Sequence, residues 1–166
     1  MARNPRCVLP GIAFHVTQRG VNRGDVFFSQ ADRLTYLRLV SEQRQEAGVR
    51  VLAWCLMTNH VHFVVVPERE DSLAVMFRRV HGRYAQYLNA RRGRTGHLWQ
   101  NRFFGCPVAG ARETSLLRYV EWNPVRAGIA AARRPGGGRA RGRIWRERKR
   151  RELIYWIGVT GGAWVA

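Results

Sequence analysis

Two histidines separated by one residue, His60 and His62, are the residues whose spacing most directly offers chemistry. They open an apolar run at 61–66 that is typical of a β-strand, where alternate side chains project from the same face. Neutral imidazole nitrogens bind divalent cations, and a bound cation can polarise a phosphate oxygen during phosphodiester transfer. The pattern also fits two ordinary strand histidines, because so short a motif occurs freely.

Tyr119 is a candidate nucleophile, because Asn123 follows four residues later on the same face of an expected helix. The Asn123 amide oxygen would offer a third metal ligand. A tyrosine with the ordinary pKa of about 10 is almost entirely protonated at neutral pH, so it needs a cation or base nearby. The alternative is a helix tyrosine packed beside Leu116 and Val120, with Asn123 at a helix end before Pro124.

The elements that would position these residues follow from the hydrophobic pattern. It predicts strands at 11–17, 49–56, 61–66 and 103–108, a hairpin turn at 57–59, and helices at about 30–47, 72–88 and 114–123. Ser29 suits the start of the first helix and Gly48 the position just past its end. The order β, α, β, β, α, β, α predicts an α+β fold, a ferredoxin-like antiparallel sheet with helices packed on its faces.

The second predicted helix, which Ser72 can cap, carries an apolar stripe expected to face the core. Its members recur at helical spacing: Leu73, Met76, Phe77, Val80, Tyr84 and Leu88. Tyr84 and Tyr87 are rival nucleophiles by residue type. Tyr84 lies on the stripe, and neither tyrosine has a neighbour like Asn123, so Tyr119 remains the favoured nucleophile.

The net charge of +18 points to a polyanionic partner. Residues 1–132 hold 19 basic and nine acidic residues, a net charge of +10, so the excess belongs largely to the expected folded part. Residues 133–166 contribute +8 and are expected to form a basic Arg/Gly-rich tail of uncertain structure, outside the single domain at 1–132.

The three cysteines, Cys7, Cys55 and Cys106, are far apart and form no C-x-x-C pair, which argues against a disulfide framework or a zinc knuckle. The apolar runs are too short to span a bilayer. We therefore expect a cytoplasmic protein that is associated with the nucleoid through DNA. We expect it to be a monomer or a homodimer.

Four sequence blocks, taken together and in order, resemble the HUH-type tyrosine transposases, specifically the insertion-sequence-200-like and REP-associated family. The blocks are FHVTQRG at 14–20, CLMTNHVH at 55–62, GHLWQNRF at 96–103 and RYVEWNPVRAG at 118–128. They cover roughly the first four-fifths of the chain, and the segment from Arg133 onward departs from the usual continuation of the family.

This resemblance implies a role for each matching residue. His60 and His62 would bind Mg²⁺ or Mn²⁺, with Asn123 where a third ligand is expected. Tyr119 would attack a DNA phosphate, giving a 5′-phosphotyrosine link and a free 3′-hydroxyl. A new 3′-hydroxyl would reverse the step and reseal the strand, so no nucleotide cofactor is needed. The implied function is transposition of single-stranded DNA at hairpin, REP-like sequences.

Single strands and hairpin tips are bound by basic grooves and by aromatic faces that stack on unpaired bases. The residues expected to contact DNA are Arg19, Asn22, Arg23, Arg79, Arg83, Trp99 and Arg102. Each arginine also fits a solvated surface charge, and Trp99 equally fits a core tryptophan.

Two other functions remain open at this level. One is a non-catalytic nucleic-acid-binding protein derived from a decayed or domesticated transposase, which the unusual tail favours and the histidines and Tyr119 oppose. The other is a different phosphoesterase with paired H-x-[ST] motifs, for which no suitable second copy is found.

Overall fold

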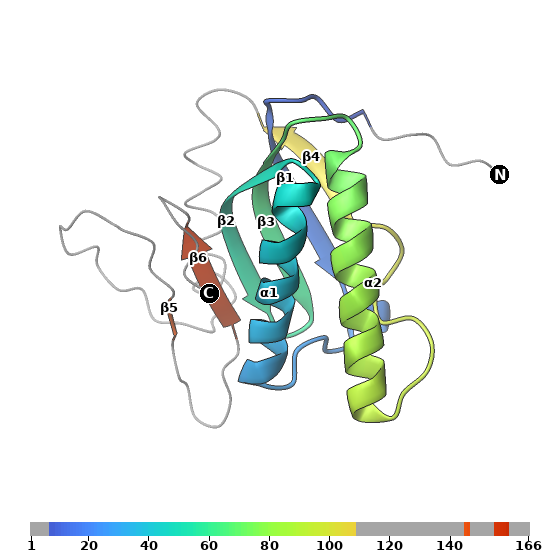
Figure 1. The fold of residues 1–166 in the computed structure, drawn as a ribbon. Coiled ribbons are helices and arrows are strands. Elements are labelled where there is room, and N and C mark those ends of the chain that lie inside the picture. Colours follow the sequence, from blue (N-terminus) through green and yellow to red (C-terminus); the bar gives the residue numbers. More distant parts are fainter. Residues whose placement is uncertain (1–6, 109–144, 147–154, 160–166) are drawn as a thin grey trace.

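The structure is a computed structural model, and it describes residues 7–108, 145–146 and 155–159 (Figure 1). The strands are β1 (Ala13–Arg19), β2 (Val49–Met57), β3 (His60–Pro67), β4 (Phe104–Val108), β5 (Trp145–Arg146) and β6 (Tyr155–Val159). The helices are α1 (Gln30–Glu46), α2 (Ser72–Arg92) and the short 3-10 turn η1 (Val21–Arg23). The predicted third helix, with Tyr119 and Asn123, lies outside the described residues.

One sheet organises these elements, in the strand order β4-β1-β3-β2-β6-β5, and every described pairing in it is antiparallel. The helices α1 and α2 lie side by side over one face of the sheet (Figure 1). The α+β class predicted from the sequence is therefore confirmed, and the order of the described elements as far as β4 matches the prediction.

Helix α1 begins where its capping residue was predicted, because the Ser29 Oγ accepts a hydrogen bond from the Asp32 N–H at 3.2 Å. Past its end, Gly48 adopts a φ of +62°, which favours glycine. Helix α2 differs by one residue: Ser72 is the first helical residue, and its Oγ accepts from the Arg69 N–H at 3.0 Å. The hairpin turn consists of Thr58 and Asn59 alone.

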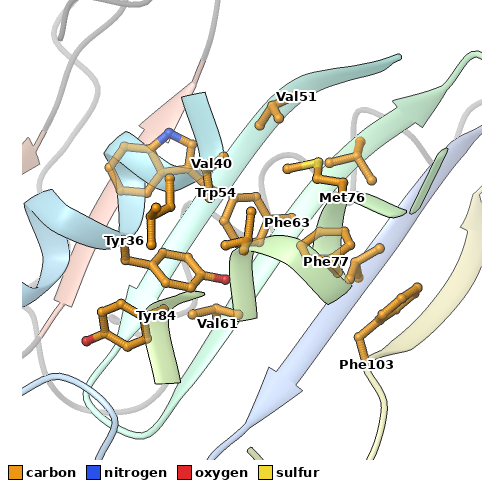
Figure 2. Close-up of a cluster of buried hydrophobic side chains, with 14 of the residues drawn as sticks. Tyr36, Val40, Val51, Trp54, Val61, Phe63, Met76, Phe77, Tyr84 and Phe103 are labelled. Atoms are coloured by element: carbon orange, nitrogen blue, oxygen red, sulfur yellow. The ribbon is translucent and has the colours of Figure 1, made fainter. Parts of the chain in front are cut away.

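The core lies between the sheet and the helices (Figure 2). All six members of the predicted α2 stripe are at most 1% exposed, which confirms that they face inward. Figure 2 shows Phe77 of this stripe beside Phe63 of β3, with their ring centroids 5.6 Å apart. A fully buried side chain of this size contributes about 1.5–3 kcal/mol, so the stripe anchors α2 firmly to the sheet.

The sheet also includes a strand that the sequence pattern did not predict. Strand β6 comes from the segment expected to be a tail, and it pairs with β2 from Ala53 opposite Val159 to Met57 opposite Tyr155. Its backbone thus supplies hydrogen bonds to an edge of β2 that would otherwise be unpaired. Within the part of the chain that the structure describes, no helix is long and apolar enough to cross a membrane.

Candidate metal and nucleic-acid site

The paired histidines lie on the sheet face opposite the helices. In the antiparallel register His62 is directly opposite Thr17 and His60 is opposite Arg19, so these four residues share a face. The intervening Val61 is fully buried in the helix-side core. The ring centroids of His60 and His62 are 4.9 Å apart, which confirms that the two imidazoles lie close together.

A third histidine, which the sequence analysis missed, joins them from β1. The Nε2 atom of His15 lies 3.0 Å from Nδ1 of His62, at hydrogen-bonding distance. The two ring planes are nearly parallel, inclined by 9°, with centroids 5.2 Å apart. His15 lies two residues before Thr17, so strand parity could have placed it on the same face, but only the pairing of β1 with β3 brings it to His62.

Asn59, the last residue of the hairpin turn, forms a hydrogen bond with the imidazole of His60. Its Oδ1 accepts a hydrogen bond from Nδ1 of His60 at 2.6 Å. The Asn59 Nδ2 donates to the backbone carbonyl oxygen of Arg23 at 2.9 Å. The backbone carbonyl of Asn59 accepts a hydrogen bond from the Gly20 N–H, also at 2.9 Å. The turn that precedes β3 is therefore tied to the η1 segment.

Burial keeps the paired imidazoles neutral. Desolvation, followed by the charge of Arg19, lowers the pKa of His60 to about 4. Desolvation is also the main reason that the pKa of His62 falls to about 3, with smaller contributions from His60, His15 and Arg19. Burial lowers the pKa of His15 as well. At neutral pH both His60 and His62 thus carry a nitrogen lone pair, the form that binds a cation.

The described residues do not by themselves form a metal site. Among them, no group of three or more histidine, cysteine or acidic side chains is arranged to hold a metal ion. Two neutral imidazoles on one face are suitable donors for a divalent cation, and any further ligand would have to come from outside this pair. The predicted third ligand, Asn123, and the predicted nucleophile, Tyr119, lie outside the described residues, so their positions remain predictions.

Several residues predicted to contact DNA gather at the His60 end of the sheet. We call Arg19, Asn22, Arg23 and Arg102 the basic rim; all four are exposed. Backbone hydrogen bonds connect the segments that carry them. The Val21 N–H donates to the Leu98 carbonyl at 3.0 Å, and the Gln100 N–H donates to the Arg19 carbonyl at 2.8 Å.

The other predicted DNA contacts lie elsewhere. Arg79 and Arg83 are on α2, where their Nη1 atoms lie 2.8 Å from carboxylate oxygens of Glu46 and Glu42 on α1. They belong to the helix layer, away from the histidines.

Trp99 is half-buried. Its Nε1 donates to the His81 carbonyl at 3.1 Å, and its ring packs against the core, in accord with the core interpretation.

The two rival tyrosines, Tyr84 and Tyr87, lie on α2 in the helix layer, and both hydroxyls are hydrogen-bonded there. The hydroxyl of Tyr84 donates to the Val26 carbonyl at 2.6 Å, and burial raises the pKa of this side chain. The Tyr87 hydroxyl donates to Asp32 Oδ1 at 3.3 Å. Neither hydroxyl faces the histidine pair, which supports ranking both below Tyr119.

Comparison with known proteins gives both sequence and structural matches. The sequence profile of the family described as "Transposase IS200 like" matches residues 9–123. None of the curated proteins compared with the chain matches it.

Two solved structures are similar to this chain. A REP-associated tyrosine transposase bound to a REP hairpin matches with a TM-score of 0.64 and 18% identity, over 78% of this chain and 76% of that one. A crystal structure described as a transposase of Deinococcus radiodurans R1 matches with a TM-score of 0.50 and 14% identity, over 79% of this chain and 100% of that one. At these identities the likeness establishes a shared fold.

Proposed function

Because the chain belongs to the IS200-like transposase family, we propose that it cleaves and rejoins single-stranded DNA at hairpin sequences through a 5′-phosphotyrosine intermediate. The observation that carries this proposal is the neutral pair His60 and His62 on the sheet face opposite the helices, beside the basic rim. This combination suits phosphodiester transfer, because it places a cation-binding group next to a surface that can hold the phosphate backbone.

In the proposed reaction the Tyr119 oxygen attacks a DNA phosphorus atom, and the bond from phosphorus to the 3′-oxygen breaks. The departing oxygen takes up a proton as the 3′-hydroxyl, and the phosphate stays joined to Tyr119 and to the 5′-oxygen of the next nucleotide. Attack by another 3′-hydroxyl reverses the exchange. His60, His62 and Asn123 would hold Mg²⁺ or Mn²⁺, which supplies charge stabilisation at the phosphate when bound.

The basic rim would hold the DNA strand during this exchange. Arg19 lies opposite His60 in the sheet register, so a phosphate that contacts its guanidinium lies near the imidazoles. The guanidinium groups of Arg23 and Arg102 are exposed on adjoining segments and suit phosphate oxygens through their planar donor geometry. The related structure bound to a REP hairpin makes a DNA hairpin the natural first substrate.

The proposal is tested by covalent adduct formation. Purified protein incubated with Mn²⁺ or Mg²⁺ and a single-stranded hairpin from its own genomic neighbourhood should form a protein–DNA adduct that survives denaturation. Tyr119→Phe removes the attacking oxygen and should abolish the adduct. Chelation of the metal should do the same. Tyr87→Phe is the matched control and should leave the adduct intact, because that hydroxyl contacts Asp32 instead of the histidine pair.

Each result has a definite reading. An adduct that persists in Tyr119→Phe would contradict the nucleophile assignment, and its disappearance in Tyr87→Phe would assign the nucleophile to Tyr87 instead. Wild-type protein that binds the hairpin tightly yet forms no adduct, across hairpins from both flanks and with either metal, would favour the non-catalytic DNA-binding function.

A further inference from the structure

We propose that Asn59 and His15 are positioning residues that set the tautomers of His60 and His62, so that both imidazoles present Nε2 toward a cation. This inference rests on the proposed function, because it concerns the same metal-binding pair. It assigns roles to two side chains outside that pair, one in the hairpin turn and one on β1.

The first step concerns His60, whose tautomer follows from the orientation of a neighbouring amide. Asn59 Nδ2 donates to the Arg23 carbonyl at 2.9 Å, which directs Oδ1 of the same amide to the imidazole. An amide oxygen only accepts hydrogen bonds. The contact of 2.6 Å from Oδ1 to Nδ1 of His60 therefore requires the proton on Nδ1, and the lone pair of the neutral ring is on Nε2.

The second step concerns His62, whose Nδ1 meets another imidazole nitrogen instead of an oxygen. Of the two nitrogens 3.0 Å apart, one donates and the other accepts. If His15 Nε2 donated, the neutral His62 would carry its own proton on Nε2 and could not bind a cation there. Metal binding through Nε2 therefore requires that His62 Nδ1 donates and that His15 Nε2 accepts.

This assignment gives His15 a defined state, a neutral ring with its proton on Nδ1. Its accepting nitrogen is engaged with His62, which makes His15 a positioning residue and not a third ligand. Partners of this kind orient the ring of a ligating histidine, and their removal weakens metal binding by about 10–100-fold. The two ring planes are inclined by only 9°, which suits an in-plane N–H···N hydrogen bond between His15 and His62.

Tautomers can be measured directly in the metal-free protein. Long-range ¹H–¹⁵N NMR spectra at pH 7 should show His60 and His62 protonated on Nδ1, and His15 with an unprotonated Nε2. This readout depends on neither metal nor activity. A spectrum with the His15 proton on Nε2 and the His62 proton also on Nε2 would overturn the proposal.

Mn²⁺ affinity, measured by the paramagnetic resonance signal of the free ion, tests the consequence. His15→Phe keeps a ring but removes the acceptor, and should weaken Mn²⁺ binding about 10–100-fold. His15→Gln, whose side-chain oxygen can accept from His62 Nδ1, should retain most of the affinity. Asn59→Ala should weaken binding as His15→Phe does, and thermal unfolding checks that each variant is folded.

His60→Ala separates the failure of this inference from failure of the proposed function. If His60→Ala abolishes Mn²⁺ binding while His15→Phe binds as well as wild type, the positioning role is wrong and the metal site stands. If His15→Gln loses as much Mn²⁺ affinity as His15→Phe, the role of His15 as a hydrogen-bond acceptor is likewise wrong. If wild type and His60→Ala both fail to bind Mn²⁺ even with hairpin DNA present, the metal site is wrong and the inference fails with it.

Discussion

At the scale of single residues, burial decides the protonation state of the histidines, and His81 is the clearest case outside the candidate site. Only 9% of it is exposed, and its Nε2 lies 3.0 Å from the Tyr36 hydroxyl, between α1 and α2. The Trp99 ring lies 4.6 Å away, centroid to centroid. Burial lowers the pKa of His81 to about 3, so this residue is neutral in the folded protein.

The stability of the protein should therefore fall in acid, in part through His81. Its pKa is lower in the folded chain than the unfolded value of 6.5, so between about pH 3 and 6.5 the unfolded chain binds the additional proton. The contribution of neutral His81 to the unfolding free energy is complete above pH 6.5. It is lost as the pH falls below that value, by about 1.4 kcal/mol per pH unit. Urea unfolding of wild type and His81→Gln between pH 7.5 and 5 measures this slope.

Because His60 and His62 also have lowered pKa values, the quantity to compare is the difference between the two proteins. The unfolding free energy of His81→Gln should depend less steeply on pH than that of wild type. The difference between the two slopes should correspond to one proton. Parallel curves for the two proteins would contradict the assignment of a neutral, buried imidazole.

At the scale of elements, the segment around η1 supports both parts of the candidate site. It carries two residues of the basic rim, and its Arg23 carbonyl orients Asn59. Two of its residues adopt left-handed backbone angles, with φ of 51° at Asn22 and 60° at Arg23. The chain turns back so tightly that a Cβ atom on Gly20 would lie 2.2 Å from the Gly24 carbonyl oxygen.

Gly20→Ala should consequently disturb this segment. The added methyl group would clash with backbone at Gly24 and with Val26 Cγ1 at 2.8 Å, so we expect a loss of about 1–3 kcal/mol in unfolding free energy. Hairpin binding should weaken as well, since the rim residues would move. Chemical denaturation and a DNA-binding titration measure the two effects.

Gly82 of α2 is the matched control. A Cβ at this position meets no heavy atom within 4 Å, and alanine is the better helix former. Gly82→Ala should raise the unfolding free energy by about 0.5–1 kcal/mol and leave DNA affinity unchanged. Equal effects of the two substitutions would mean that the close approach at Gly20 does not constrain the turn.

At the scale of the whole molecule, two groups of arginines in the described part of the chain differ in their pairing. On the helix layer many arginines pair with carboxylates, as Arg79 does with Glu46 and Arg83 with Glu42. The arginines of the basic rim, by contrast, form no ion pair with any carboxylate of the described part of the chain. The charge of the rim is thus available to a polyanion.

DNA affinity should depend steeply on salt, because phosphate contacts release counterions. Each phosphate contact that is removed should reduce the slope of log K against log salt concentration by about 1. We expect this reduction for Arg19→Ala, Arg23→Ala and Arg102→Ala, measured by fluorescence anisotropy at several salt concentrations. A slope near zero for wild type would contradict electrostatic binding.

Arg79→Ala and Arg83→Ala are the comparison, because their guanidinium groups already face Glu46 and Glu42. Neither substitution should change the slope, and each exposed pair should contribute no more than about 1 kcal/mol to stability. A reduced slope in these variants would instead confirm the DNA track along α2 that the sequence predicted.

Features that depend on neighbours along the chain were predictable from the sequence. The alternation of β3 placed His60 and His62 on one face, and the helical repeat of α2 identified the six residues that the core buries. Ser29 and Gly48 marked the ends of α1. Each of these follows from the periods of strand and helix or from the chemistry of a helix end, which act over a few residues.

Features that depend on which distant segments meet were decided by the tertiary structure alone. His15 reaches His62, 47 residues away, only through the register between β1 and β3. The pairing of Arg83 with Glu42 and of β6 with β2 similarly needs the packed fold. A one-residue change of register would turn His15 to the opposite face while the local sequence pattern stayed the same, so the pattern could not specify this contact.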